Sequence, residues 1–112
     1  MKKINILKKN IDFQRIIKTI KPYKYKNYII YIERIKSENY CFGISVGTKI
    51  GKAVTRNKIR RQIKHILDQN NYQKGFNCII IVKKQVISIS FLEMKKELFE
   101  ILAEIDVLKE ND

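Results

Sequence analysis

The residues best suited to chemistry lie in one stretch, 43–64, which carries arginine, lysine and glycine but no acid. Guanidinium groups bind phosphate oxygens in pairs, and an asparagine amide can bond to a sugar or a base. Gly47 and Gly51 allow a tight loop whose backbone N–H groups can approach a phosphate where a predicted helix begins. The pattern predicts anion binding by Lys49, Lys52, Arg56, Asn57, Lys58, Arg60, Arg61 and Lys64.

A helix face that simply contacts water is the usual explanation of such a charge run. Residues 48–66, however, carry seven basic residues and no acid. Like charges at this density repel one another unless a polyanion neutralises them. The stretch therefore favours phosphate binding over a solvated face.

Residues for catalysis by the protein itself are scarce. His65 is the only histidine, and no Ser/His/Asp or Cys/His arrangement is spaced to create a nucleophile. Cys41 and Cys78 lie in apolar stretches without metal-ligand spacing, so we expect buried thiols and no zinc site. The sequence predicts neither a catalytic residue nor a metal site.

The formal net charge of +13 over 112 residues indicates a polyanionic partner. Nucleic acid is the leading candidate and a membrane surface the runner-up. No apolar run of about 18 residues and no signal peptide occurs, so we expect a cytoplasmic protein without a membrane segment. Basic residues dominate 1–26 and 48–66, whereas seven acids lie in 91–112, so anion binding belongs to the first two-thirds of the chain.

Two elements are predicted ahead of the basic stretch. Asn10 is expected to cap a helix that stops by Lys21, because Pro22 disfavours helical geometry there. Residues 27–35 are β-branched and aromatic on both faces, which predicts a central strand. The apolar face of the helix carries Phe13, Ile16, Ile17 and Ile20.

A second strand is predicted over residues 40–46, and the short connection before it suggests a hairpin with the first strand. One of its faces is unusually small, which would let a helix or a ligand approach the sheet closely. The small residues are Cys41, Gly43 and Ser45.

The remaining predicted elements are a helix over 54–69, a buried strand over 78–82 and a last helix opened by Ser90 with Glu93 in a capping box. The apolar stripe of the last helix is expected to face the core and its acids the solvent. That stripe is Phe91, Met94, Leu98, Ile101, Leu102 and Ile105.

The element order indicates an α+β class, with a small sheet backed by helices. At 112 residues the chain has room for one domain, 1–112. It would begin with a basic segment, 1–9, and end with an acidic tail, 106–112.

The run from Gly43 to Arg61, GISVGTKIGKAVTRNKIRR, resembles the signature of the bacterial ribonuclease P protein component. The resemblance extends to Lys8–Gln14, which is similar to the first-helix start of that family, and to Tyr28–Tyr31, which is similar to its aromatic first strand. It covers roughly residues 7–83.

The resemblance implies a protein subunit that binds a catalytic RNA through the basic helix, with Lys49, Lys52, Arg56, Asn57, Lys58, Arg60 and Arg61 toward the RNA. It also implies a cleft between the first helix and the sheet that holds the 5′ leader of precursor tRNA, lined by Phe13 and Tyr31 with Tyr28 nearby. Aromatic rings suit this task because exposed bases stack on them with little sequence demand. For Phe13, core packing is an equal alternative.

The implied fold is a small α/β sandwich with a mostly antiparallel sheet and a left-handed βαβ crossover, similar to a ribosomal-protein domain. General rules predict a right-handed crossover instead. The implied reaction is removal of the leader by phosphodiester hydrolysis. The resemblance implies Mg²⁺ that is bound mainly by the RNA, with none bound tightly by the protein. It also implies that the protein acts as a monomer.

Three positions depart from the family pattern. Lys58 stands where arginine is usual, Thr48 where lysine is common, and Ile17 where a second aromatic often lines the cleft. An rRNA-binding scaffold of ribosomal type remains the main alternative, because composition alone does not exclude it. DNA binding is a weaker one, since no two-helix recognition unit is visible.

Overall fold

The structure, a computed structural model, describes residues 4–109. The ends of the predicted basic segment and acidic tail, 1–3 and 110–112, lie outside the described residues. Two short 3-10 turns, Thr48–Ile50 and Lys84–Ser88, accompany the main elements. The helices and strands are α1 Asn10–Thr19, β1 Tyr23–Tyr25, β2 Tyr28–Arg34, β3 Tyr40–Val46, α2 Ala53–Leu67, β4 Phe76–Val82 and α3 Phe91–Glu104.

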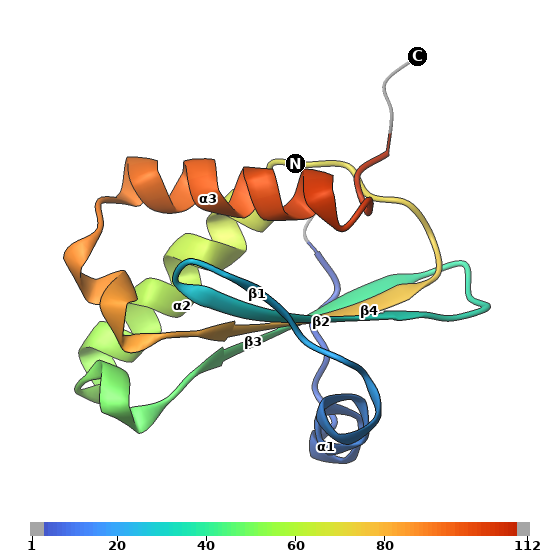
Figure 1. The fold of residues 1–112 in the computed structure, drawn as a ribbon, viewed down its shortest axis with the longest axis horizontal. Coiled ribbons are helices and arrows are strands. Elements are labelled where there is room, and N and C mark those ends of the chain that lie inside the picture. Colours follow the sequence, from blue (N-terminus) through green and yellow to red (C-terminus); the bar gives the residue numbers. More distant parts are fainter. Residues whose placement is uncertain (1–3, 110–112) are drawn as a thin grey trace.

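A four-stranded sheet in the order β1-β2-β4-β3 forms the middle layer. The pairs β1–β2 and β2–β4 are antiparallel and β3–β4 is parallel. Helices α2 and α3 cover one face and α1 crosses the other (Figure 1). The predicted α+β sandwich with a mostly antiparallel sheet is confirmed.

The predicted hairpin between β2 and β3 is wrong, because β4 lies between these strands. The side chains of β4 explain its place: Ile79 and Ile80 point to opposite faces, and both are fully buried. A strand that is apolar on both faces is best covered in the middle of a sheet. The short strand β1, which pairs with β2 around a turn with Lys26 at φ 45°, was not predicted.

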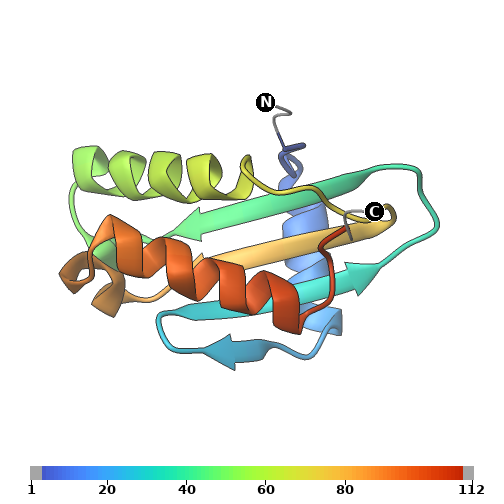
Figure 2. The ribbon, with the colours of Figure 1, turned by 90° about the horizontal axis from the view of Figure 1, so that it is seen from above.

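The connection from β3 through α2 to β4 is a left-handed crossover. Seen from above, β3 and β4 point the same way and α2 lies on the viewer's side of the sheet, beyond β3 (Figure 2). This handedness is the one that the family resemblance implies and the opposite of the common one. Because the loop from Val46 to Ala53 is short, α2 begins at the C-terminal end of β3.

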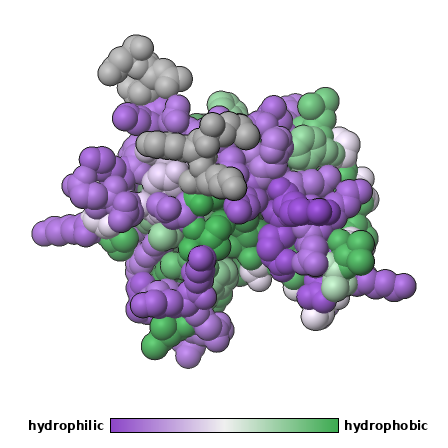
Figure 3. All heavy atoms as spheres, turned by 180° about the vertical axis from the view of Figure 1, so that it is seen from behind, coloured by the Kyte–Doolittle hydropathy of each residue, from purple (hydrophilic) through white to green (hydrophobic). Residues whose placement is uncertain are grey.

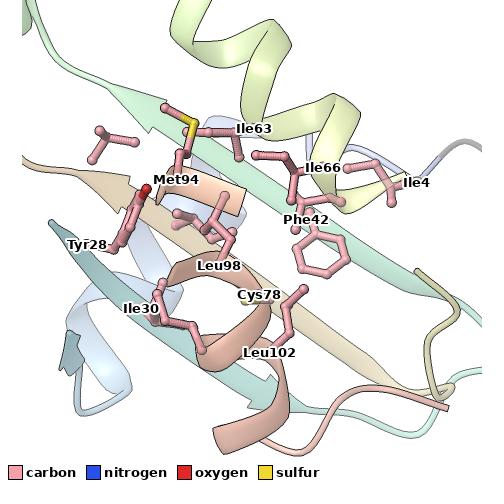
Figure 4. Packing of buried hydrophobic residues seen from close by; sticks show 14 of the residues in the cluster. Ile4, Tyr28, Ile30, Phe42, Ile63, Ile66, Cys78, Met94, Leu98 and Leu102 are labelled. Carbon is pink, nitrogen blue, oxygen red and sulfur yellow. The ribbon is translucent and has the colours of Figure 1, made fainter. Parts of the chain in front are cut away.

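The core lies between the sheet and the pair α2–α3 (Figure 4). Helix α2 contributes Ile59, Ile63, Ile66 and Leu67, all at most 6% exposed, as its apolar spacing predicts. Burial of each such side chain contributes roughly 1.5–3 kcal/mol. The opposite side of α2 is left free to carry charge.

Two details of the helices differ from the prediction. Asn10 is the first residue of α1 and not its cap; Lys9 takes the cap position without a side-chain hydrogen bond. In α3, Ser90 caps as predicted, with its hydroxyl oxygen accepting from the Glu93 N–H at 3.1 Å. The acids of α3 do not all face solvent, because Glu97 is 4% exposed and accepts a bond from the Asn27 amide at 2.8 Å.

Candidate nucleic-acid interface

The basic face of α2, defined as Asn57, Arg60, Arg61 and Lys64, is the most concentrated charge in the described chain. These side chains and Val54 line a shallow hollow of about 500 Å³. Arg60 donates to the amide oxygen of Asn57 at 2.9 Å, which orients both side chains outward. Hydrophilic side chains cover the α2 region when the molecule is seen from behind (Figure 3).

Local sequence explains why this face starts where it does. Gly51 has φ 151°, in a region that L side chains rarely adopt, and it turns the chain from the 3-10 turn into α2. The Nε of Arg56 donates to the Gly51 carbonyl at 3.2 Å, so this arginine reaches back across the loop. Lys49 and Lys52 are exposed on the same loop.

Within residues 4–109, the ion pairs involve Arg15 and Lys74 and none of the arginines or lysines of α2. Unpaired cations on one face create a field that attracts polyanions. The structure distributes the predicted anion-binding residues of α2 over two hollows. Lys58 does not line the hollow of the basic face. It lines the adjoining one together with Arg61, Gln62, His65 and Phe91.

Helix α1 crosses the other sheet face and is fixed there at two points. The ring of Phe13 lies on Gly43, whose missing side chain leaves the space: a Cβ there would be 2.5 Å from Cε2 of the ring. Arg15 donates two hydrogen bonds to the Glu33 carboxylate on β2, one of them at 3.1 Å. The prediction of a close approach over the small face of β3 is confirmed.

Hydrogen bonding dominates the charge state of Glu33. The bond from Arg15 lowers the pKa of Glu33, and a bond from the Asn77 amide lowers it further, while burial acts in the opposite direction. The Glu33 side chain is 13% exposed and that of Arg15 is 46% exposed, so solvent reaches the clamp mainly from the arginine side. It holds α1 at a fixed place against the sheet.

Tyr31 and Tyr28 occupy opposite faces of β2, because successive side chains of a strand alternate. Tyr31 is partly exposed on the α1 side and in register with Ile79 and Gly43. Tyr28 is fully buried on the α2–α3 side (Figure 4). Tyr28 therefore cannot present its ring to a base, and its predicted place in the cleft is wrong.

The sheet also determines where the two predicted buried cysteines lie. Cys78 is buried in the core, and burial raises the pKa of its thiol to about 12, whereas Cys41 is partly exposed. The sheet register pairs Cys78 with Phe42, so Cys78 and Cys41 point to opposite faces. Between residues 4 and 109, no three His, Cys, Asp or Glu side chains are grouped to hold a metal, and no helix is long and apolar enough to span a membrane.

Comparison with known sequences decides the family. Residues 1–106 match the family model described as ribonuclease P. The chain belongs to the ribonuclease P protein family. It is 41% identical over 108 residues to the ribonuclease P protein component of Mycoplasma mycoides, which covers 94% of this chain and 99% of the relative. A relative from Streptococcus pyogenes is 36% identical over 103 residues, covering 91% of this chain and 87% of the relative.

Solved structures of the ribonuclease P protein have the same fold. The Staphylococcus aureus protein superimposes with a TM-score of 0.84 at 29% identity, covering 96% of this chain and all of that one. The Thermotoga maritima protein gives 0.80 at 26% identity, covering 91% and 98%. The fold that the resemblance implied is thereby established for this chain.

Sequence reasoning missed two features of the structure. Phe91, predicted to face the core, is 38% exposed and lies beside His65, with 6.2 Å between ring centroids. The Arg15–Glu33 clamp was also missed. The i, i+3, i+4, i+7 spacing of Lys58, Arg61, Gln62 and His65 indicates one helical stripe, but nothing in the sequence shows that Phe91 meets it.

Proposed function

We propose that this chain, as the protein subunit of ribonuclease P, binds two RNAs at once. The basic face of α2 and the loop before it would bind the catalytic RNA. The open part of the sheet face beside α1 would hold the single-stranded 5′ leader of precursor tRNA. The observation that carries the proposal is the unpaired positive charge of α2, where Arg60, Arg61 and Lys64 line one hollow.

The charge of α2 suits an RNA backbone. Arginine forks bind phosphate with directional hydrogen bonds, and each contact releases counterions from the RNA. Lys58 would contribute charge without the bidentate geometry of an arginine. Lys49 and Lys52 would extend the positive surface along the loop toward the sheet edge.

The leader site would use Tyr31 as its aromatic platform. Tyr31 is partly exposed, and the neighbouring positions Ile29, Ile81 and Ser45 on the same sheet face are also only partly covered. These positions run from the row of Tyr31 toward the end of β3, where the loop with Lys49 begins. Phe13 would form the wall of the cleft and not a stacking surface, because its ring packs against the backbone of Gly43.

In this proposal the protein does not carry out the hydrolysis. Mg²⁺ held mainly by the RNA would supply the attacking hydroxide and stabilise the leaving oxygen. The protein, acting as a monomer, would offset the repulsion between the two RNA backbones and keep the leader in place. The alternative, an rRNA-binding scaffold, is disfavoured by family membership.

The salt dependence of RNA binding tests the basic face. The affinity of the protein for its ribonuclease P RNA is measured at several salt concentrations for the wild type and for Arg60→Gln with Arg61→Gln. Losing two phosphate contacts should reduce the slope of log affinity against log salt by about two. The control, Lys95→Gln with Lys96→Gln on α3, removes the same charge elsewhere and should leave the slope near that of the wild type. Equal slopes for all three proteins would refute the assignment of α2.

A further inference from the structure

A second hollow adjoins the basic face of α2 at the point where α2 meets the first residue of α3. Its volume is about 360 Å³, and it is lined by Lys58, Arg61, Gln62, His65 and Phe91. The four residues from α2 are spaced i, i+3, i+4 and i+7, so they form one stripe along the helix. Arg61 lines this hollow and that of the basic face, so the two adjoin at this side chain.

Two aromatic rings form one wall of this hollow. The His65 and Phe91 rings are inclined at 36° with their centroids 6.2 Å apart. Phe91 is 38% exposed, although the next two residues of its apolar stripe, Met94 and Leu98, are buried. An exposed ring beside a histidine offers a surface for stacking.

The orientation of His65 is held by Gln69, in the turn that follows α2. The Gln69 amide nitrogen lies 3.1 Å from Nε2 of the His65 ring. The amide donates to Nε2 when the ring is in the tautomer that carries its hydrogen on Nδ1. That tautomer leaves the Nδ1 hydrogen for an oxygen of a ligand. In that tautomer the histidine offers both a ring for stacking and a hydrogen-bond donor.

Charge distinguishes this hollow from the larger one between α3 and the C-terminal end of α2. The larger hollow includes the carboxylates of Glu93 and Glu100, which offset the charges of Lys95 and Lys96. The hollow at His65 includes two cations, Lys58 and Arg61, and no acid. The aromatic wall matches the face of a base, and the two cations match its phosphate. The Gln62 amide matches the hydrogen-bonding edge of the base.

We propose that this hollow binds one unpaired nucleotide of the RNA that occupies α2. The base stacks on Phe91 and His65, and its phosphate lies against Lys58 and Arg61. Gln62 bonds to the edge of the base. The inference rests on the proposed binding of ribonuclease P RNA by α2 and adds an aromatic contact to that electrostatic one.

The test compares the affinity of Phe91 variants for the ribonuclease P RNA. Phe91→Ala should weaken binding about 5- to 100-fold, the range for loss of a stacked aromatic, without changing the salt slope because the ring has no charge. Phe91→Tyr should bind like the wild type. Phe91→Leu keeps apolar bulk without a ring, so it should bind as weakly as the alanine variant. The control, Phe99→Ala on the same helix, removes a ring that is 52% exposed and should have no effect.

Chemical probing of the RNA gives a second readout. One unpaired base should be protected by the wild type and by Phe91→Tyr and become reactive with Phe91→Ala. If Phe91→Ala or Phe91→Leu binds like the wild type while the Arg60, Arg61 variant is weakened, the nucleotide site is refuted and RNA binding by α2 stands. This is also the result expected if Phe91 contacts another protein. If the Arg60, Arg61 variant is not weakened, the basis of both proposals fails.

Discussion

The ring of Phe13 occupies the place that a side chain of residue 43 would fill, because a Cβ on Gly43 would lie 2.5 Å from its Cε2 and 2.8 Å from its Cζ. Non-bonded carbon atoms do not approach so closely, so any larger residue at position 43 must displace the ring or the helix that carries it. One glycine in β3 thus sets how closely α1 lies on the sheet.

Gly43→Ala should therefore lower the free energy of unfolding by about 1–3 kcal/mol, the usual cost of overpacking. Urea unfolding measures it. Gly47→Ala is the matched control, because nothing lies within 4 Å of a Cβ there and its φ of −72° suits any residue. The control should change the stability by less than about 1 kcal/mol. Equal effects of the two substitutions would contradict the packing described for Phe13.

Two buried tyrosines should respond in opposite ways to loss of the hydroxyl. Tyr28 Oη has no hydrogen-bond partner among the described residues, whereas the Tyr72 hydroxyl donates to the Leu67 carbonyl at 2.6 Å. Removing an unsatisfied polar group is neutral or stabilising, and removing a satisfied one costs about 1 kcal/mol. Thermal or urea unfolding should show Tyr28→Phe as stable as the wild type or more so, and Tyr72→Phe less stable. The reverse order would mean that Tyr28 Oη is satisfied in solution.

The clamp between Arg15 and Glu33 should make stability depend on acid pH. Because the folded pKa of Glu33 lies below its ordinary value of 4.5, its contribution is complete above that value and is lost as pH falls through the lowered one. Glu33→Gln should lower the free energy of unfolding at neutral pH, and its difference from the wild type should shrink below about pH 4.5. The control, Glu38→Gln, breaks an ion pair whose two side chains are 83% and 70% exposed, so it should have a much smaller effect. A difference from wild type that stays constant down to acid pH would contradict the clamp.

Tyr31 should contribute to the binding of precursor tRNA and not to the binding of mature tRNA. In the reconstituted enzyme, Tyr31→Ala should weaken binding of precursor tRNA about tenfold, within the range for loss of one stacked base, and leave the affinity for tRNA without a leader unchanged. Phe99→Ala serves as the exposed aromatic control. Equal weakening with both tRNAs would place Tyr31 outside the leader site.

The sequence predicted the elements that periodicity or composition determines. The apolar spacing of α2, the small face of β3 and the basic face were all correctly predicted. The place of β4 was not, because the choice between a β2–β3 hairpin and an inserted strand depends on contacts between residues far apart in the chain. The left-handed crossover could come only from the family resemblance, since general chirality rules favour the other hand.

The candidate site shows the same division. The cations of α2 are adjacent in sequence, so they could be found by counting charges. Tyr28 was misplaced because a strand that is apolar on both faces does not reveal which face a helix pair will cover. Phe91 was misplaced because its position satisfies the apolar stripe of α3, and only the packing shows that the stripe leaves the core at its first residue.

The central claim is that α2 supports ribonuclease P activity through its positive charge. The most direct measurement is the rate at which a bacterial ribonuclease P RNA cleaves precursor tRNA at low Mg²⁺, alone, with this protein, and with its Arg56→Ala, Arg60→Ala, Arg61→Ala variant. The account predicts strong stimulation by the wild type, most of it lost in the variant, and no cleavage by the protein without the RNA. A folded wild-type protein that fails to stimulate its own cognate RNA, or a variant that stimulates equally well, would contradict the account.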